Sequence, residues 1–340
     1  MSSWVILSTH SLDPDSLNLL LQEGVRVITP PSKRLFNRRS WILENVSEAS
    51  ILIAGFTRID KPIIDGSPRL ELIVSRSSGV DHIDVEYAES KGICVANQPE
   101  AIAEAVAEHI VGLIVSSLRR ITKGHLYVVE GGWYENGFLR GVTLRGKTLG
   151  VVGMGRIGSL ASLHLRMLGV SKVLYWSRSR KREVEQLLKA EPASLDRIFR
   201  ESDVIVVTLP ITRETKGIIG YELLSKMKEN ALIVNVGRGG VIDEDSLARV
   251  LRERSDILAA LDVYEKEPLP PDDKLVKIAK ETDRLVLTPH NAGGTDLSMK
   301  LTSLLAVKQV IHYINTGEVW NPVTSTCREA RDIAGLWADF

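Results

Sequence analysis

Short runs of Val, Ile and Leu alternate along the chain with amphipathic stretches. Most of these runs are continuous rather than interrupted by polar residues, which is typical of strands buried on both faces of a parallel sheet. A first group of runs occupies 4–8, 25–29, 51–54, 72–75 and 93–96. A second group occupies 148–152, 173–176, 204–209, 232–236, 257–261 and 285–288. The pattern predicts an α/β chain with two doubly wound parallel sheets, the second of six strands.

Three longer stretches complete the pattern. Residues 100–121 form an apolar stretch with Ala and Glu in its first turns, which predicts a helix, and 296–315 predicts a last helix after the final strand. Between them, 124–146 is rich in Gly, contains Trp133 and Tyr134, and is expected to be loop-like. The last helix could close the second sheet or return to the first, and the pattern leaves both open.

Composition narrows the class of protein. Lys plus Arg number 43 and Asp plus Glu number 43, a balance that argues against a nucleic-acid binder. Hydrophobic residues make up 44% and charged residues 25%, which is ordinary for a globular protein. No apolar stretch approaches the roughly 20 residues that cross a bilayer, and the first residues lack the basic segment of a signal peptide. We expect a protein that is soluble and does not bind membranes.

The chain has two cysteines, Cys94 and Cys327. They are too few for a disulfide framework and have no metal-ligand spacing, so a reducing, cytoplasmic setting is expected. Cys94 falls on an apolar run and is expected in the core.

A glycine motif follows the run at 148–152. Gly153, Gly155 and Gly158 form G-x-G-x-x-G between a predicted strand and a predicted helix at 157–168. In that position the first glycine allows a tight turn, the second lets a pyrophosphate approach the backbone, and the third permits close packing of helix on strand. A plain glycine turn is the weaker interpretation. The motif predicts dinucleotide binding.

The next predicted strand ends without the usual acidic residue. That residue would bind the ribose hydroxyls of NAD, but here the strand runs into Ser177, Arg178, Ser179 and Arg180. Guanidinium and hydroxyl groups can bind a 2′-phosphate, so we expect NADP(H) to be preferred, with NAD(H) possible. The alternative is a solvated basic turn that tolerates either cofactor.

Three polar residues follow the last predicted strands, where ligands bind in such sheets. Arg238 comes after 232–236, Glu267 after 257–261, and His290 after 285–288. A guanidinium can clamp a carboxylate and polarise a carbonyl, an imidazolium can give up a proton, and a carboxylate partner orients the ring. Together they suit the reduction of a 2-keto acid.

These residues lie in motifs that resemble the D-isomer-specific 2-hydroxyacid dehydrogenase family. N-x-x-R-G at 235–239, D-V-x-x-x-E-P at 262–268 and T-P-H at 288–290 all lie downstream of the glycine motif. The segments 77–84 (SSGVDHID), 97–99 (NQP) and 106–109 (VAEH) also match, so the resemblance spans essentially the whole chain. The stretch 177–181 (SRSRK) is most similar to archaeal-type glyoxylate reductases.

The resemblance implies an architecture and a set of roles. A dinucleotide-binding Rossmann domain at 100–295 would be inserted into a flavodoxin-like substrate-binding domain made of 1–99 and 296–340, and the protein would be a homodimer. Arg238 would bind substrate, His290 would be the acid/base and Glu267 its partner, while the backbone amides of Ser78 and Gly79 would hold the substrate carboxylate. The residues implied at the cofactor are Gly153, Gly155, Arg156, Ile157, Gly158, Ser177, Arg178, Ser179, Arg180, Pro210, Val236, Gly237 and Asp262.

Besides the missing acidic residue, one position departs from the family pattern and one arginine is ambiguous. Asn291 follows His290 where the family usually has an aliphatic residue. Arg76 precedes the substrate loop and could accept a phosphate, as a phosphoglycerate dehydrogenase-type substrate would require, although members of that type have their arginine one residue earlier. A non-catalytic dinucleotide-sensing regulator is a further alternative, which the three catalytic side chains argue against.

The remaining polar and aromatic candidates have structural interpretations. His82, between Asp81 and Asp84, is expected in a structural turn rather than at a metal, and His109 is expected to be a packed or exposed helix residue. Trp133, Tyr134 and Trp320 are expected in interdomain or dimer packing.

Overall fold

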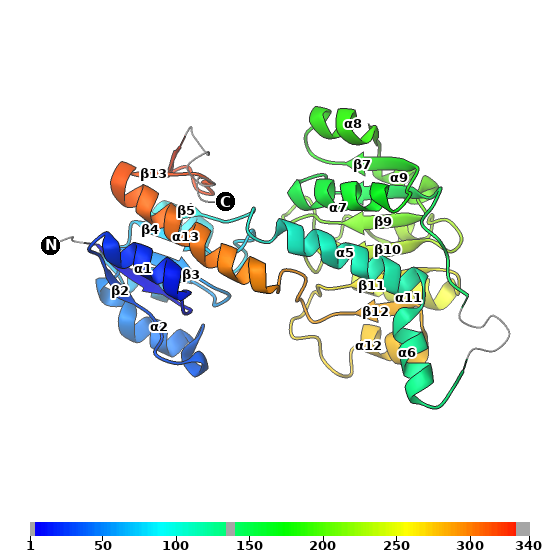
Figure 1. Ribbon diagram of the computed structural model, residues 1–340, viewed down its shortest axis with the longest axis horizontal. Coiled ribbons are helices and arrows are strands. Elements are labelled where there is room, and N and C mark those ends of the chain that lie inside the picture. Colours follow the sequence, from blue (N-terminus) through cyan, green and yellow to red (C-terminus); the bar gives the residue numbers. More distant parts are fainter. Residues whose placement is uncertain (1–3, 134–139, 331–340) are drawn as a thin grey trace. The chain divides into compact units, whose positions relative to one another are not determined.

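The computed structural model describes residues 4–133 and 140–330, and these form two compact units. Unit 1 comprises residues 1–102 and 294–340, and unit 2 comprises residues 103–293. Each unit is built around a parallel sheet flanked by helices (Figure 1). Because unit 1 is made from both ends of the chain, unit 2 is an insertion within it.

The sheet of unit 1 has five strands, as predicted, in the order β2-β1-β3-β4-β5. This is the flavodoxin-like order of a doubly wound fold. Every residue of β1, β3 and β4 is buried, which explains why these strands read as unbroken apolar runs. The strands are β1 (Val5–Ser8), β2 (Arg26–Ile28), β3 (Ile51–Ala54), β4 (Leu72–Ser75) and β5 (Cys94–Ala96).

Helix α13 (Asp296–Thr316) belongs to unit 1, which settles where the last helix goes. Its Ala306, Val307 and Val310 are fully buried in one hydrophobic cluster with residues of β1, β3, β4 and β5. In Figure 1 this orange helix lies beside the blue and cyan elements of the chain's first hundred residues. The other helical elements of the unit are α1 (Pro14–Gln22), η1 (Lys33–Leu35), α2 (Arg39–Asn45), η2 (Val46–Glu48), α3 (Lys61–Asp65) and α4 (Val85–Ser90).

The segment after α13 returns along β5 and corrects the expectation about the cysteines. Val323 N donates to Val95 O at 2.8 Å, and this course brings Cys327 to Cys94, with which it forms a disulfide at a Cα–Cα separation of 4.8 Å. Two cysteines are too few for a disulfide framework, and this single disulfide was not anticipated, because the pairing depends on a return of the chain that local patterns do not show. Cys94 is buried in the core, as expected. The segment also contains the short pair β13 (Glu318–Val319) and β14 (Arg328–Glu329).

Trp320 lies inside unit 1 rather than at an interdomain or dimer surface. It is 7% exposed and packs with Ala101, Leu305 and Ala330, and His312 stacks on its ring. The expectation for Trp320 was wrong, since the returning segment covers its side chain.

The sheet of unit 2 has seven strands in the order β12-β11-β10-β9-β6-β7-β8. This is the Rossmann order extended by one strand. The prediction of six strands missed β8, a three-residue edge strand whose Glu191 and Pro192 are exposed and leave no apolar run. The strands are β6 (Thr148–Val152), β7 (Lys172–Trp176), β8 (Ala190–Pro192), β9 (Val204–Val207), β10 (Leu232–Asn235), β11 (Leu258–Leu261) and β12 (Leu285–Leu287).

Helices cover both faces of this sheet. The expected helix over 100–121 is α5 (Ala103–Leu118), and the loop expected over 124–146 begins instead with α6 (Ile121–Val129). Arg120 adopts a left-handed conformation with φ 53° between the two helices, and Gly124 is tolerated inside α6. Tyr134 lies outside the described residues. The remaining helices are α7 (Arg156–Met167), α8 (Arg182–Leu188), α9 (Leu195–Glu201), α10 (Tyr221–Leu224), α11 (Glu244–Glu253) and α12 (Lys274–Glu281).

No helix among the residues described is both long enough and apolar enough to cross a bilayer.

Candidate active site

The glycine motif joins β6 to α7 beside the point where the strand order of unit 2 reverses, between β6 and β9. Gly153 has φ +110°, and a Cβ there would lie 2.8 Å from Thr208 Oγ1. A Cβ on Gly158 would lie 2.4 Å from Gly153 O. A Cβ on Gly155, by contrast, would meet no atom within 4 Å. Two glycines are thus required by packing, while Gly155 faces open space.

That open space lies at the N-terminus of α7, where Gly155 is the N-cap and Arg156 and Ile157 are the first helical residues. The first N–H groups of a helix lack intrahelical acceptors, and the helix dipole favours negative charge there. Backbone, dipole and open space together fit the pyrophosphate of a dinucleotide.

The basic turn after β7 contains a carboxylate that the sequence did not indicate. A pocket of about 310 Å³ is lined by Tyr175, Trp176, Ser177, Ser179, Arg180, Pro192 and Ala193. Arg180 Nε donates to both carboxylate oxygens of Glu185 at 2.9 and 3.1 Å, and Tyr175 Oη also donates to Glu185 at 2.5 Å. The hydrogen bond to Glu185 raises the pKa of Arg180, and the bond from Arg180 lowers that of Glu185. Glu185 was not singled out from the sequence, since it lies on α8 and approaches Arg180 only in the folded chain.

On the other side of the switch point, the loop after β9 contains Pro210. Thr215 Oγ1 donates to Pro210 O at 2.6 Å, which fixes the start of this loop. The charge of Arg178 contributes to lowering the pKa of Glu214 in the same loop, after hydrogen bonds from Thr212 and the backbone. The basic turn after β7 and the loop after β9 thus share an electrostatic environment.

Arg238 is held at the end of β10 by a tight backbone. Asn235 is buried, and its side-chain amide makes two hydrogen bonds. Its Nδ2 donates to Arg238 O at 3.1 Å, and its Oδ1 accepts from Gly237 N at 3.1 Å. A Cβ on Gly239 would lie 1.8 Å from Tyr264 O, so only glycine allows the chain to pass here. Val236 and Gly237 therefore lie in a fixed turn that carries the Arg238 guanidinium at the carboxyl edge of the sheet.

Glu267 and His290 form a close pair at the same edge. His290 Nδ1 lies 2.6 Å from Glu267 Oε2, and Tyr264 N donates to Glu267 Oε1 at 3.0 Å. Burial opposes ionisation of Glu267, but the bonds from His290 and Tyr264 and the charges of His290 and Arg238 outweigh it, so its pKa lies below the ordinary value. The structure thus brings together the three residues that the sequence singled out.

The segment that carries His290 is tied to Asp262. His290 has φ +50°, a left-handed conformation that few non-glycine residues adopt. Asp262, expected near the nicotinamide, accepts from Thr288 Oγ1 at 2.6 Å, Asn291 N at 3.1 Å and Ala292 N at 3.0 Å. Asn291 therefore has a backbone role in this turn, and its side chain is exposed.

In unit 1, the loop after β4 presents backbone N–H groups. The carbonyl oxygens of the loop are occupied: Asn97 Nδ2 donates to Ser78 O at 2.7 Å, and Ser75 Oγ and Ser77 Oγ donate to Gly79 O at 2.9 and 2.8 Å. Within the described part of the chain, the N–H groups of Ser78 and Gly79 donate to no acceptor. Two adjacent N–H groups without acceptors suit an anion such as a carboxylate.

Arg76, which could have bound a phosphate, is turned into unit 1. Its side chain donates to Ser303 Oγ at 2.7 Å and Thr302 Oγ1 at 3.3 Å on α13, and to Ser11 O at 3.4 Å. It is 8% exposed, and burial lowers its pKa to about 10. The guanidinium is therefore used inside the unit.

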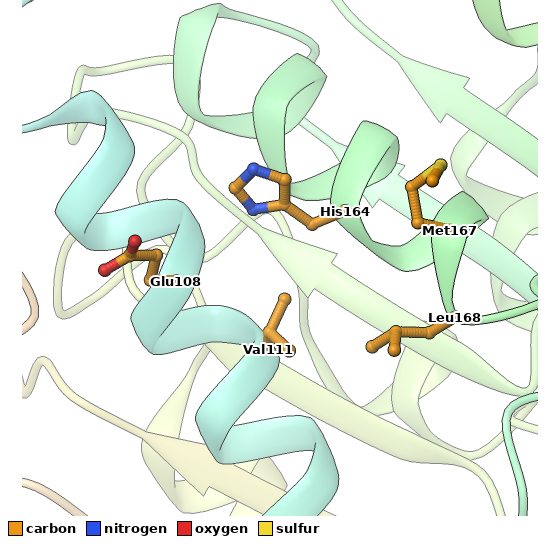
Figure 2. Close-up of a pocket in the computed structure, with 5 residues that line it drawn as sticks. All are labelled: Glu108, Val111, His164, Met167 and Leu168. Carbon is orange, nitrogen blue, oxygen red and sulfur yellow. The ribbon is translucent and has the colours of Figure 1, made fainter.

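A second hollow of about 320 Å³ lies between α5 and α7 (Figure 2). Val111, Met167 and Leu168 line it together with Glu108 and His164. Its lining is mostly apolar and lacks the glycine loop and the catalytic side chains, so it is not the active-site candidate. In the described chain, no group of three His, Cys, Asp or Glu side chains could hold a metal ion.

Comparison with known proteins agrees with this geometry. Residues 111–292 match the family model described as D-isomer specific 2-hydroxyacid dehydrogenase, NAD binding domain. A glyoxylate reductase from Aeropyrum pernix is 39% identical over 320 residues, covering 91% of this chain and 92% of that protein.

Two solved structures are similar over nearly the whole chain. An NADPH-dependent glyoxylate/hydroxypyruvate reductase from Sinorhizobium meliloti, in complex with NADP and malonate, has TM-score 0.81 and 27% identity over 98% of this chain and 100% of that one. A D-lactate dehydrogenase from Aquifex aeolicus, complexed with NAD and lactic acid, has TM-score 0.78 and 28% identity over 94% of this chain and 99% of that one. The family match, the shared fold and the full-length similarity lead to one conclusion: the chain belongs to the D-isomer-specific 2-hydroxyacid dehydrogenase family and is an oxidoreductase.

Proposed function

We propose that this protein reduces a small 2-keto acid, such as glyoxylate or hydroxypyruvate, to the D-2-hydroxy acid with NAD(P)H. The observation that carries the proposal is the 2.6 Å pair of His290 and Glu267, with Arg238 close enough to lower the pKa of the same carboxylate. The similarity to glyoxylate reductases supports the choice of substrate.

In this mechanism His290 is the general acid. Its Nδ1 faces Glu267, so Nε2 is the atom that gives a proton to the carbonyl oxygen. Glu267 fixes the orientation of the ring and stabilises its protonated form. A bound dinucleotide supplies the hydride that the carbonyl carbon accepts. The proton from His290 completes the hydroxyl group, and reversal of both transfers gives the oxidation.

Two groups hold the substrate. Arg238 offers a planar fork of donors that binds the carboxylate and polarises the carbonyl. The N–H groups of Ser78 and Gly79 would donate to the carboxylate as well, and the carbonyl oxygens of these two residues are already occupied within the loop. A phosphorylated substrate is not favoured, because Arg76 is committed to Ser303 and Thr302.

The cofactor would lie along the carboxyl edge of the unit 2 sheet. Gly153, Gly155, Arg156, Ile157 and Gly158 would hold the pyrophosphate, which the open space at Gly155 supports. The residues that would surround the rest of the dinucleotide are Ser177, Arg178, Ser179, Arg180, Pro210, Val236, Gly237 and Asp262. We expect NADP(H) to be preferred, through Arg178 above all, because Glu185 already engages Arg180.

The two units would bind different molecules. A domain at 100–295 would bind the dinucleotide, and a domain made of 1–99 and 296–340 would bind the 2-keto acid, with no nucleic acid or membrane as partner. We propose the cytoplasm as the location. The Cys94–Cys327 disulfide is compatible with that location only where intracellular disulfides persist, as in some organisms that live at high temperature. Cell fractionation tests it.

A homodimer is the proposed assembly, with α6 and α7 of unit 2 on the interface. Val129 and Met167 are 70% and 83% exposed, and Trp133 is 73% exposed nearby in sequence. Several large apolar side chains exposed on one helix mark a surface that another protein covers, whereas a single one such as Leu187 on α8 does not. Light scattering after gel filtration tests this: Met167→Glu should shift the protein toward a monomer, while Leu187→Glu, on exposed α8, should not.

Initial rates with glyoxylate, measured with NADPH and NADH at matched concentrations, test the function. Turnover favouring NADPH supports both the reductase and the role of Arg178. Turnover favouring NADH keeps the reductase and makes the basic turn a surface feature. Higher activity on 3-phosphohydroxypyruvate would overturn the substrate assignment. Tight NADPH binding without turnover of any 2-keto acid would indicate a dinucleotide sensor instead.

A further inference from the structure

His109 on α5 contacts the buried carboxylate that holds the His290 segment. His109 Nε2 lies 3.3 Å from Thr288 Oγ1 and 3.6 Å from Asp262 Oδ1. The Asp262 side chain is 1% exposed, and that of His109 is 22% exposed. The sequence indicated only a packed or exposed helix residue, because the contact spans 179 positions of the chain.

The donors and acceptors of this cluster have one consistent arrangement. The Thr288 hydroxyl donates its hydrogen to Asp262 Oδ1 at 2.6 Å, so its oxygen is left to accept. His109 Nε2 must then carry a hydrogen and donate it to Thr288 Oγ1. The result is a chain of hydrogen bonds from His109 through Thr288 to Asp262.

Asp262 accepts hydrogen bonds from residues on both sides of the catalytic histidine. It accepts from the Thr288 side chain, two positions before His290, and from the N–H groups of Asn291 and Ala292, the two positions after it. Within the described residues, His109 is the only basic side chain with a nitrogen within 4.0 Å of the Asp262 carboxylate. A buried polar group needs hydrogen-bond partners, and His109 supports the Thr288–Asp262 contact from the side of α5.

The segment 288–292 that Asp262 contacts is strained at His290. His290 adopts φ +50°, and such conformations persist only where surrounding contacts fix them. Tyr264 Oη adds a bond to Thr288 O at 2.7 Å, but this bond holds only the start of the segment. After His290, the N–H groups of Asn291 and Ala292 both donate to Asp262.

We propose that His109 is a positioning residue for the reaction: through Thr288 and Asp262 it keeps His290 in the geometry that delivers the proton. The proposal rests on the proposed function for its effect on rate, whereas its effect on the segment itself does not require turnover. Plain packing of His109 on the helix is the competing explanation, and the two differ in what a conservative variant restores.

Variants at two positions separate these explanations. His109→Met keeps much of the volume and removes the donor, and His109→Gln keeps an N–H at the corresponding distance along the side chain. We expect His109→Met to lower kcat by about 10- to 100-fold, the size of effect that small misplacements of reacting groups produce, with KM for the 2-keto acid within about two-fold. His109→Gln should recover most of kcat. Lys277→Met, at an exposed position of α12 outside both the site and the proposed dimer interface, is the control and should leave kcat unchanged.

A double-mutant cycle tests the connection through Thr288. If the chain of bonds is real, Thr288→Val already breaks it, and adding His109→Met should lower kcat little further. Independent, multiplicative losses in the double variant would overturn the proposal. Equal kcat in His109→Met and His109→Gln would do the same, since packing alone then explains the residue.

Hydrogen–deuterium exchange of the peptide covering 288–293 gives a readout that needs no activity. Exchange should rise in His109→Met and Thr288→Val, and stay at the wild-type rate in His109→Gln and Lys277→Met. If the wild type reduces no 2-keto acid while exchange follows this order, the proposed function fails and the positioning role stands. Unchanged exchange in His109→Met, or raised exchange with unchanged kcat in an active enzyme, would overturn the positioning role.

Discussion

Arg180 Nε lies 2.9 and 3.1 Å from the two carboxylate oxygens of Glu185. The basic turn that follows β7 is therefore less basic than its sequence indicates, because one of its guanidinium groups faces a carboxylate. Arg178 is exposed in the same turn and forms no such pair in the described chain. The two arginines should consequently differ in what they contribute to cofactor choice.

Arg178→Ala should lower the preference for NADPH more than Arg180→Ala. Loss of a charge-assisted bond to the 2′-phosphate should reduce the ratio of kcat/KM for NADPH to that for NADH by about 10-fold or more. Arg180→Ala should change the ratio less, and Glu185→Gln should raise it by removing a repulsive charge. Steady-state kinetics with both cofactors measures all three. A larger loss in Arg180→Ala would reverse the assignment.

Replacing His290 should remove proton transfer and leave cofactor binding intact. General acid catalysis contributes about 10²–10⁴-fold in rate, so we expect a fall in kcat on that scale in His290→Gln. Because His290 has φ +50°, His290→Asn is a useful second variant, since Asn tolerates the left-handed region. NADPH fluorescence titration provides the control for cofactor binding. Wild-type kcat in either variant would exclude His290 as the acid.

Glu267 should govern the pH dependence. Its pKa lies below the ordinary value despite burial, mainly through His290, so the carboxylate stays charged through neutral and mildly acidic pH. In Glu267→Gln, kcat should begin to fall at a lower pH as the solution is made more alkaline. The protonated ring of the general acid then has no carboxylate beside it to stabilise its charge. An unchanged profile would mean that Glu267 is not the partner.

The lowered pKa of Glu267 should also make the stability of the folded protein depend on pH. A carboxyl group whose pKa is lowered on folding stabilises the native state above its unfolded pKa and loses that contribution as the pH falls through the folded value. The wild-type Tm should therefore fall relative to that of Glu267→Gln below about pH 4.5, and the difference should be constant near neutral pH. Thermal denaturation across this range measures it.

The Cys94–Cys327 disulfide should stabilise unit 1. It links residues 233 positions apart, and disulfides that close long loops typically contribute about 2–4 kcal/mol. Cys327→Ser should lower Tm by several degrees, and a reducing agent should do the same to the wild type. The agent should have no further effect on Cys327→Ser, which serves as the control. Equal Tm values for oxidised wild type and variant would contradict this role.

Much of the fold could be predicted because local pattern and burial coincide in this protein. Buried strands such as β3 and β9 read as continuous apolar runs, and the glycine motif could be placed between a strand and a helix. What the patterns missed depends on distant contacts. β8 is a short edge strand, and the return of the segment after α13 pairs Cys94 with Cys327 and buries Trp320.

The residues of the candidate site also fall into those that local patterns show and those that only distant contacts show. Arg238, Glu267 and His290 could be found because each follows a strand, and strand ends of a parallel sheet share one edge. Glu185 and His109 could not, because each lies on a helix whose amphipathic pattern already accounts for it. Only the hydrogen bonds of Tyr175 and Arg180 to Glu185, and the packing of α5 beside β11 and β12, show their second role.

The division of the chain has a consequence for its synthesis. Residues 103–293 form a continuous unit, so its sheet can be complete as soon as that stretch has left the ribosome. The first 102 residues, by contrast, must wait for α13 and the segment after it, which cover one face of their sheet and supply Cys327. The part of the protein made first is therefore the part finished last. A chain that terminates before residue 294 would carry a complete nucleotide-binding fold attached to a sheet with an uncovered apolar face.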